Sequence, residues 1–380
     1  MTLLLYTSIS LLILLLAFKL FHQTRTRPKL PPSPPSLPIL GHLHLIKKPI
    51  HRTFHRLSQK YGKVFSIKFG SQLVVIVSSP SAVEECFTKN DVILANRPRS
   101  LIGKHLAYNF TTLIASPYGD HWRNLRRISA LEIFSNNRLN MFLGIRRDEV
   151  KHLLWKLSRN SCQGFAKVEL KSMFSELTFN IIMRMVAGKR YYGEDVKYEE
   201  EARKFRGLVK EIVALGGVSN PGEFVPVLRW IDRGGLEKKV MGVSKRMDTF
   251  LQGLIDEKRS KDEEGNTMID HMLSLQKSQP EYYTDQIIKG LILLVKSDAH
   301  KLIPFGLGRR ACPGAGLAQR TMSLTLGSLI QCFEWERVTK EEVDMAEGIA
   351  VVMPKAVPLE AMCKARPIMH KVLSESLHDV

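Results

Sequence analysis

The 380-residue sequence predicts a mainly α-helical protein with a small β portion. Residues 146–284 follow the hydrophobic pattern of amphipathic helices, with charged faces and few glycine or proline breakers. Two β-rich runs, Val64–Phe69 and Leu73–Ser78, are joined by Gly70 and Ser71 and predict a hairpin. The late apolar run Ile349–Lys355 predicts one more strand that ends in a turn. The strands are therefore a minor part of the predicted fold.

The N-terminal segment is predicted to anchor the chain in a membrane. Residues Leu3–Phe21 are nearly all apolar, and this length is sufficient to cross a bilayer. The segment has neither the basic start nor the small-residue cleavage site of a signal peptide, so we expect an uncleaved anchor over residues 1–22. Arg25 and Arg27 follow it, and the positive-inside rule then places the body of the protein in the cytosol.

A basic, proline-rich hinge is predicted over residues 23–41. Its proline run, residues 28–38, is typical of a semi-rigid spacer between a membrane and a globular body. By itself such a run would also suit a ligand of a proline-reading domain, but its place directly after a membrane span favours the spacer. Residues 42–380 then form the predicted globular domain.

The charge balance limits the classes of partner. The formal net charge is +19, which suits nucleic acid, anionic lipid or an acidic protein surface. The sequence contains no RNA-binding or zinc-finger pattern, so we expect no nucleic-acid partner. The five cysteines are scattered without the spacing of a metal clip or a disulfide framework, which suits a reducing compartment.

The segment around Cys312 is the most informative part of the chain. Residues 305–314 read FGLGRRACPG and fit the pattern F-x-x-G-x-R-x-C-x-G at every fixed position. A cysteine thiolate is a soft ligand, and on haem iron it pushes electron density toward bound oxygen. Glycines at 306, 308 and 314 let a backbone turn tightly and pass close to a flat macrocycle.

The position of Cys312 also favours the thiolate form. Pro313 and Gly314 open an apolar helical stretch, Ala315–Phe333, so Cys312 stands at the start of a predicted helix. The positive end of the helix dipole and the neighbouring Arg309 and Arg310 stabilise a negative sulfur. An ordinary buried cysteine beside a glycine-rich turn is the alternative, and it does not account for the five matched positions.

A second segment, residues 118–127, reads YGDHWRNLRR. On a helix, Trp122 and Arg126 lie four residues apart and share a face. An indole N–H and a guanidinium that project together form a donor pair suited to a carboxylate. Taken alone, the segment would equally fit a basic, solvated helix.

Together the two segments resemble the cytochrome P-450 superfamily of haem-thiolate monooxygenases. The resemblance is to the plant membrane-bound type, and the hinge and both segments are similar to those of isoflavone hydroxylases. It implies haem b as cofactor, with Cys312 as the axial ligand of the iron. The other implied cofactor-binding residues are Trp122, Arg126 and Arg310 at the haem propionates, and Phe305, Gly308 and Gly314 in the loop around the sulfur.

The resemblance also implies a reaction and its partners. One oxygen atom of O2 enters a small organic substrate, here a small aromatic compound of isoflavonoid type, and the other becomes water. The electrons come from NADPH through a reductase, whose acidic face would suit the basic residues Arg123, Arg127 and Arg309. The implied location is the endoplasmic reticulum membrane, reached through a single N-terminal span.

The resemblance skips an internal block. The apolar helix that begins at Thr284 should lead into a long oxygen-binding helix, but it runs through residues 296–303 directly into the cysteine loop. About a hundred residues are missing near this junction, well beyond loop variation, and with them the E-x-x-R and P-E-R-F segments. The implied fold is therefore a cytochrome P-450 fold truncated internally. The alternative function is a non-catalytic truncated product that at most binds haem or the reductase.

Overall fold

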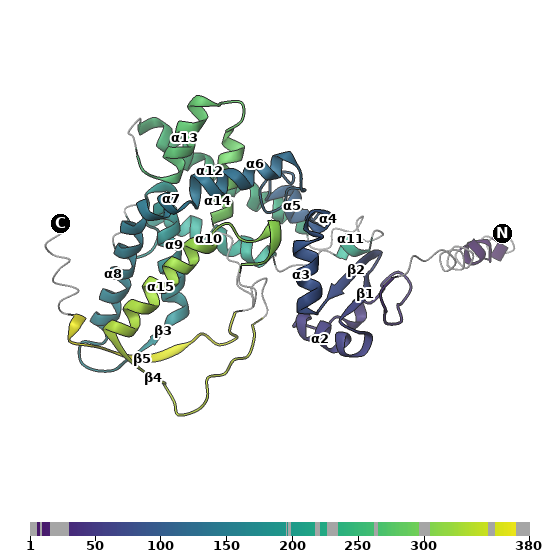
Figure 1. The fold of residues 1–380 in the computed structure, drawn as a ribbon, viewed down its shortest axis with the longest axis horizontal. Coiled ribbons are helices and arrows are strands. Elements are labelled where there is room, and N and C mark those ends of the chain that lie inside the picture. Colours follow the sequence, from purple (N-terminus) through teal and green to yellow (C-terminus); the bar gives the residue numbers. More distant parts are fainter. Residues whose placement is uncertain are drawn as a thin grey trace. The chain divides into compact units, whose positions relative to one another are not determined.

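The computed structural model describes residues 6–7, 10–15, 30–194, 196, 199–216, 221–225, 235–261, 265–295, 305–348 and 354–369 (Figure 1). Helices dominate these ranges and the strands form two small antiparallel sheets, which confirms the predicted mainly α class. Within the described ranges, no helix combines the length and apolar character needed to cross a membrane. Most of the predicted anchor, residues 23–29 of the hinge, the predicted junction at 296–303 and residues 349–353 of the last predicted strand lie outside these ranges.

The chain divides into two compact units. The first comprises Met1–Val83 with Phe224–Pro226, and the second Glu84–Glu223 with Val227–Val380. The described elements of the first unit are the 3₁₀-helix η1 (Leu43–Leu45), α2 (Ile50–Tyr61), β1 (Val64–Phe69) and β2 (Gln72–Val77), and α3 (Pro80–Thr88) begins in it.

The predicted hairpin of the first unit is present. Strands β1 and β2 pair antiparallel, with Val64 opposite Val77 and Phe69 opposite Gln72. The turn is left-handed at Gly70, and any side chain there would collide with the Phe224 carbonyl. This position therefore requires glycine.

Part of the predicted hinge is hydrogen-bonded to this hairpin. The backbone N–H of Ser66 donates to the Pro32 carbonyl at 2.8 Å, and the Ser66 hydroxyl donates to the Pro31 carbonyl at 2.9 Å. The buried ring of His42 accepts from the Lys68 N–H through Nδ1 at 2.7 Å, so Nε2 carries the proton and donates to the Pro34 carbonyl at 2.8 Å. Residues 31–34 are thus fixed to β1, and the spacer role of the whole hinge stays a prediction.

The second unit is built mainly of helices. Its described N-terminal half holds α4 (Asp91–Leu94), α5 (Leu101–His105), α6 (Asp120–Ile128), the π-helix η2 (Ser129–Ile133), α7 (Asn136–Met141), α8 (Leu143–Asn160), β3 (Ala166–Glu169) and α9 (Leu170–Ala187). The described remainder holds α10 (Glu199–Gly216), α11 (Pro221–Phe224, which ends in the first unit), α12 (Leu236–Lys261), α13 (Met268–Ser278), α14 (Asp285–Val295), the 3₁₀-helix η4 (Gly308–Arg310), α15 (Ala315–Cys332), β4 (Phe333–Glu336) and β5 (Glu360–Ala365). The three strands pair antiparallel in the order β3-β5-β4.

The core of the second unit consists of two hydrophobic clusters that meet at α9. Helices α6, α10, α12, α13 and α14 supply most of the first cluster, whereas α8, α15 and the sheet supply most of the second. Met183 of α9 belongs to the first cluster, and Ile181 and Met185 belong to the second. A helix that is apolar on opposite sides is buried on both, which makes α9 the central helix of this unit.

The segment Leu101–Ser116 begins with the short helix α5. Its start is capped by Ser100, whose side-chain oxygen accepts a hydrogen bond from the Gly103 N–H at 3.0 Å. After α5 the backbone is left-handed at three consecutive residues, Tyr108, Asn109 and Phe110. The Tyr108 hydroxyl donates to the Asp248 carboxylate at 2.9 Å, which ties this turn to α12.

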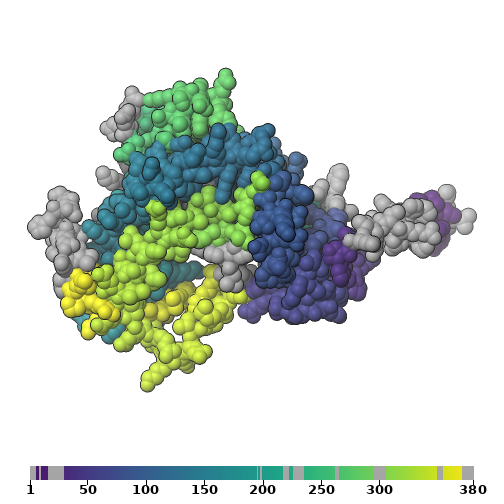
Figure 2. Space-filling model, viewed as in Figure 1, coloured from purple at the N-terminus to yellow at the C-terminus, as the bar shows by residue number. Residues whose placement is uncertain are grey.

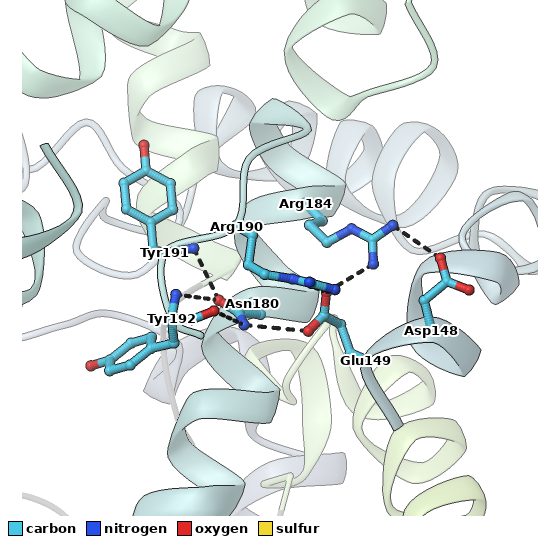
Figure 3. Close-up of polar contacts among 7 residues, drawn as sticks. All are labelled: Asp148, Glu149, Asn180, Arg184, Arg190, Tyr191 and Tyr192. Atoms are coloured by element: carbon cyan, nitrogen blue, oxygen red, sulfur yellow. Dashed lines mark hydrogen bonds and ion pairs between the residues drawn. The ribbon is translucent and has the colours of Figure 1, made fainter. Parts of the chain in front are cut away.

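A buried acidic side chain joins α8, α9 and the turn that follows α9 (Figure 3). Glu149 is 3% exposed, and its Oε1 accepts hydrogen bonds from Arg184 and Arg190, both at 2.8 Å. Asn180 donates to Glu149 Oε2 at 3.3 Å, and its own oxygen accepts from the N–H groups of Tyr191 and Tyr192. A buried carboxylate needs such partners, because an unpaired charge away from water is strongly unfavourable.

We predict that Glu149→Gln destabilises the protein by about 3 kcal/mol, because it leaves two guanidinium groups without their shared buried counter-charge. Asp148→Asn is the matched control. Asp148 is the adjacent residue, is half exposed and pairs with Arg184 at the surface, so its loss is expected to cost under about 1 kcal/mol. The free energy of unfolding of the detergent-solubilised chain in urea measures both. Equal losses from the two substitutions would show that the buried position of Glu149 does not matter.

Candidate functional site

The loop before α15 is closed by its own backbone. The Cys312 N–H donates to the Phe305 carbonyl at 2.7 Å, and the Ala311 N–H donates to the Gly308 carbonyl at 3.0 Å. Gly306 and Gly308 both have left-handed φ values. A side chain at Gly308 would also collide with the Phe87 carbonyl, so two independent constraints require glycine at this position.

The structure places Cys312 just ahead of a helix. Helix α15 begins at Ala315 with Gly314 as its N-cap, so the partly exposed Cys312 lies within three residues of the first helical residue. The N-terminal end of a helix stabilises a negative sulfur. Cys332 and Cys363 are buried, and burial raises the pKa of both thiols. Cys312 is therefore a partly exposed cysteine just before a helix, whereas these two cysteines lie in the core.

Arg126 connects α6 to this loop. Its Nη1 donates to the Ala311 carbonyl at 2.6 Å, one residue before the cysteine. Burial lowers the pKa of the Arg126 guanidinium, and the neighbouring Cys312 acts in the opposite direction. Arg126, a predicted propionate contact, therefore lies beside the loop of Cys312, the predicted iron ligand. The two residues are 186 positions apart in sequence.

Trp122 and Arg310 also come together. The centre of the Arg310 guanidinium lies 4.4 Å from the centroid of the buried Trp122 ring. Trp122 Nε1 and Arg310 Nη1 both donate to the Leu113 carbonyl at 3.1 Å, and Arg310 donates further to the carbonyls of Ala95 and Ser116. The structure thus gathers Trp122 and Arg310 with their N–H groups directed at backbone carbonyls, and their predicted role at the propionates stays a prediction.

Arg97, Arg126 and Arg310 form a cationic cluster near the loop. The sequence pointed to Arg126 and Arg310 but not to Arg97. Burial first, and then repulsion from Arg97 and Arg126, lowers the pKa of Arg310 to about 10. Across the described ranges, neither Arg126 nor Arg310 has a carboxylate partner. The adjacent Arg309, by contrast, pairs with Asp91 at 2.9 Å. Arg97 follows Asn96 in a polar stretch, where no motif or spacing distinguishes it from a solvated arginine.

The chemistry of this donor set fits a haem. A thiol at a helix N-terminus is a suitable ligand for iron, and a group with two carboxylates would supply the negative charge that the arginine cluster lacks. Cys312 would be the iron ligand, and Trp122, Arg126 and Arg310 would be the donors to the carboxylates. When bound, haem supplies the iron on which oxygen is activated. The chain would contribute the ligand, the counter-charge and the glycine-rich loop.

The helix that the resemblance places over the opposite face of such a site is described only in part. Helix α14 packs Ile288, Leu291 and Ile292 into the first hydrophobic cluster. The described part of the helix ends at Val295, and the chain is described again from Phe305 onward. The predicted junction near 296–303 therefore lies outside the described residues.

The sequence is similar to known proteins along nearly all of its length. The profile of the family described as Cytochrome P450 matches residues 31–295 and 294–359. Cytochrome P450 81Q32 of Catharanthus roseus is 45% identical over 495 aligned positions, which cover 98% of this chain and 99% of that protein. Isoflavone 2'-hydroxylase of Glycyrrhiza echinata is 41% identical, with 97% and 98% covered, and isoflavone 3'-hydroxylase of Medicago truncatula is 42% identical, with 92% and 95% covered.

These matches confirm the family that the residues around Cys312 and Trp122 predict. The family uses haem iron and electrons that pass from NADPH through a reductase, and the haem-thiolate chemistry agrees with the donor set around Cys312. Because the family profile covers most of the chain and the relatives align over more than nine tenths of it, the protein belongs to the cytochrome P450 monooxygenase family.

Proposed function

We propose that this chain retains the haem-ligand half of a plant monooxygenase that hydroxylates a small aromatic substrate of isoflavonoid type. The observation that carries this proposal is the arginine cluster beside Cys312, in which Arg126 and Arg310 have no carboxylate partner among the described residues. In this proposal Cys312 binds the iron, Trp122, Arg126 and Arg310 hold the propionates, and Phe305, Gly308 and Gly314 shape the loop. The names of the isoflavone hydroxylases among the relatives support the substrate class.

The binding of haem would require a local exchange of hydrogen bonds. Arg310 now donates to three backbone carbonyls, and Arg126 donates to one. Donation to an ionised carboxylate is stronger than donation to a neutral carbonyl, so propionates would compete well for these groups. The carbonyls that are released would then need water or other donors.

We further propose that turnover is lost because an internal block is missing. The family match falls into two stretches that meet at residues 294–295. The alignment with Cytochrome P450 81Q32 spans 495 positions, whereas this chain has 380 residues, which supports an absent block of about the size that the sequence predicts. Oxygen activation needs a water-excluding site with placed proton donors, and the resemblance assigns those donors to the missing block.

An exposed apolar stripe on α15 supports the same proposal. Met322, Leu326 and Ile330 are four residues apart and are 50%, 59% and 60% exposed. Helix α15 lies at the surface in the view of Figure 2, where it is yellow-green. Such a stripe is expected where a packing partner has been removed. This observation favours the second candidate function, a non-catalytic product that at most binds haem or the reductase.

The proposed partners are membrane lipid, the NADPH-dependent reductase and the organic substrate, in the endoplasmic reticulum membrane with the body in the cytosol. The apolar N-terminal segment, Leu3–Phe21, supports the membrane anchor. Arg123 and Arg127 support a basic docking face for the reductase, because both are solvent-exposed residues of α6.

A reduced carbon-monoxide difference spectrum of the chain in membranes tests the haem proposal. We expect a weak but measurable band of cysteinate-ligated haem, and its complete loss in Cys312→Ala. Cys162→Ala is the control, because Cys162 is an exposed cysteine outside the loop and its loss should leave the band unchanged. No band from the unaltered chain with haem supplied would refute haem binding through Cys312.

The arginine cluster gives a second test. We predict that Arg310→Lys lowers the amount of haem retained per polypeptide by roughly tenfold, because a point charge replaces the planar fork that a carboxylate binds. Arg309→Lys serves as the control, since Arg309 pairs with Asp91 at the surface. Haem and protein are quantified after gel filtration. Equal retention in both variants would remove Arg310 from the propionate contacts.

The loss of turnover is tested by incubating the chain with reductase, NADPH and isoflavones. We expect no hydroxylated product, even from preparations in which the cysteinate band is present, because the proton-delivering residues are absent. Chromatography with mass detection measures the product. Hydroxylated isoflavone that disappears in Cys312→Ala would show that the shortened chain is a complete catalyst.

A further inference from the structure

Phe134 lies where three parts of the second unit meet. Its ring packs against both hydrophobic clusters. It also reaches the cysteine loop: a β-carbon built on Gly314 would lie 3.4 Å from Phe134 Cε1 and 3.8 Å from Cys312 Sγ. The edge of the phenyl ring and the sulfur therefore border the same small space beside Gly314. A thioether or thiol sulfur beside the edge of an aromatic ring makes a favourable contact.

The local backbone explains how Phe134 reaches the loop. The π-helix η2 ends at Ile133, and the Phe134 N–H donates to the Ser129 carbonyl at 2.9 Å, five residues back. In an uninterrupted α-helix, Ile133 would lie on the same face as Arg126, because residues seven apart share a face. The extra residue of a π-turn moves each following side chain back by one position. It therefore carries Phe134 to the side of the helix from which Arg126 reaches Ala311.

Side-chain contacts hold the π-helix as well. Glu132 accepts a hydrogen bond from His271 of α13 at 2.6 Å, and the Ser129 hydroxyl donates to the Leu125 carbonyl at 2.8 Å. The side chain of Ile133 is buried in the first cluster. A π-turn is rare and costs backbone hydrogen-bond geometry, so a segment fixed in this way at a ligand loop indicates a functional role.

We propose that Phe134 is a positioning residue for Cys312. Its ring fills the space beside Gly314, restricts the rotamers of the Cys312 side chain and keeps water from the sulfur. Removal of the ring would leave a cavity next to the thiol and let the side chain rotate away. The functional part of this inference rests on the proposed haem-ligand role of Cys312. The restriction of the Cys312 thiol by Phe134 does not require haem.

The test compares Phe134→Ala with Phe142→Ala. Phe142 is a buried phenylalanine of the second cluster that follows α7, so its loss weakens the core without opening the space beside Gly314. The first readout is the rate at which a thiol reagent modifies Cys312 in the haem-free full chain, measured by mass spectrometry of the Cys312 peptide. The second is the fraction of carbon-monoxide complexes that show the cysteinate band.

We expect Phe134→Ala to increase the modification rate several-fold and to lower the cysteinate fraction. Phe134→Leu should restore both toward the unaltered chain, because leucine refills most of the space. Phe142→Ala should reduce stability and leave both readouts unchanged. If Phe134→Ala does not accumulate, Phe134→Val is measured instead, and a smaller change in the same direction is expected.

Equal effects of the substitutions at 134 and 142, or no effect at 134, would overturn the inference. If the unaltered chain forms no cysteinate complex, the proposed haem function fails. The modification rates then decide the role of Phe134 by themselves. The two claims can therefore fail separately.

Discussion

The junction between α6 and the cysteine loop is the contact on which the proposed site depends. Arg126 donates to the Ala311 carbonyl, and Arg310 stacks on Trp122, so three cationic or donor side chains converge next to Cys312. Partly buried guanidinium groups that repel one another, with no acidic partner among the described residues, are unfavourable, and burial and repulsion lower the pKa of Arg310. A ligand with two carboxylates would remove this penalty. The cluster therefore supports the proposed haem site more strongly than the cysteine motif does alone.

The packed core of the second unit supports that junction. Helix α9 separates two hydrophobic clusters, and the Glu149 network ties it to α8 and to the turn after it. Phe134 touches both clusters and the cysteine loop, so the core and this loop share one contact. In the described part of the chain, α15 exposes an apolar stripe of Met322, Leu326 and Ile330.

Local sequence patterns predicted the elements near the ligand well. The F-x-x-G-x-R-x-C-x-G pattern, together with the apolar run after Gly314, predicted a helix from Ala315, where α15 begins. The spacing of Trp122 and Arg126 predicted their shared helix, α6. Arg97 and Phe134 could not be found in this way, because they reach the loop from distant positions. A π-turn, which no pattern in the sequence marks, brings Phe134 there. The carbonyl partners of Arg310 likewise depend on tertiary contacts alone.

The central claim is that the ligand half is intact and that an internal block is absent. Its most direct test inserts, between Leu294 and Val295, the segment that isoflavone 2'-hydroxylase of Glycyrrhiza echinata carries at the corresponding position. Reductase-supported hydroxylation of isoflavones is then measured with and without the insertion. The account predicts that the insertion produces turnover that Cys312→Ala abolishes, while the chain as it stands has none. Equal turnover without the insertion, or an inserted chain that binds haem independently of Cys312, would contradict it.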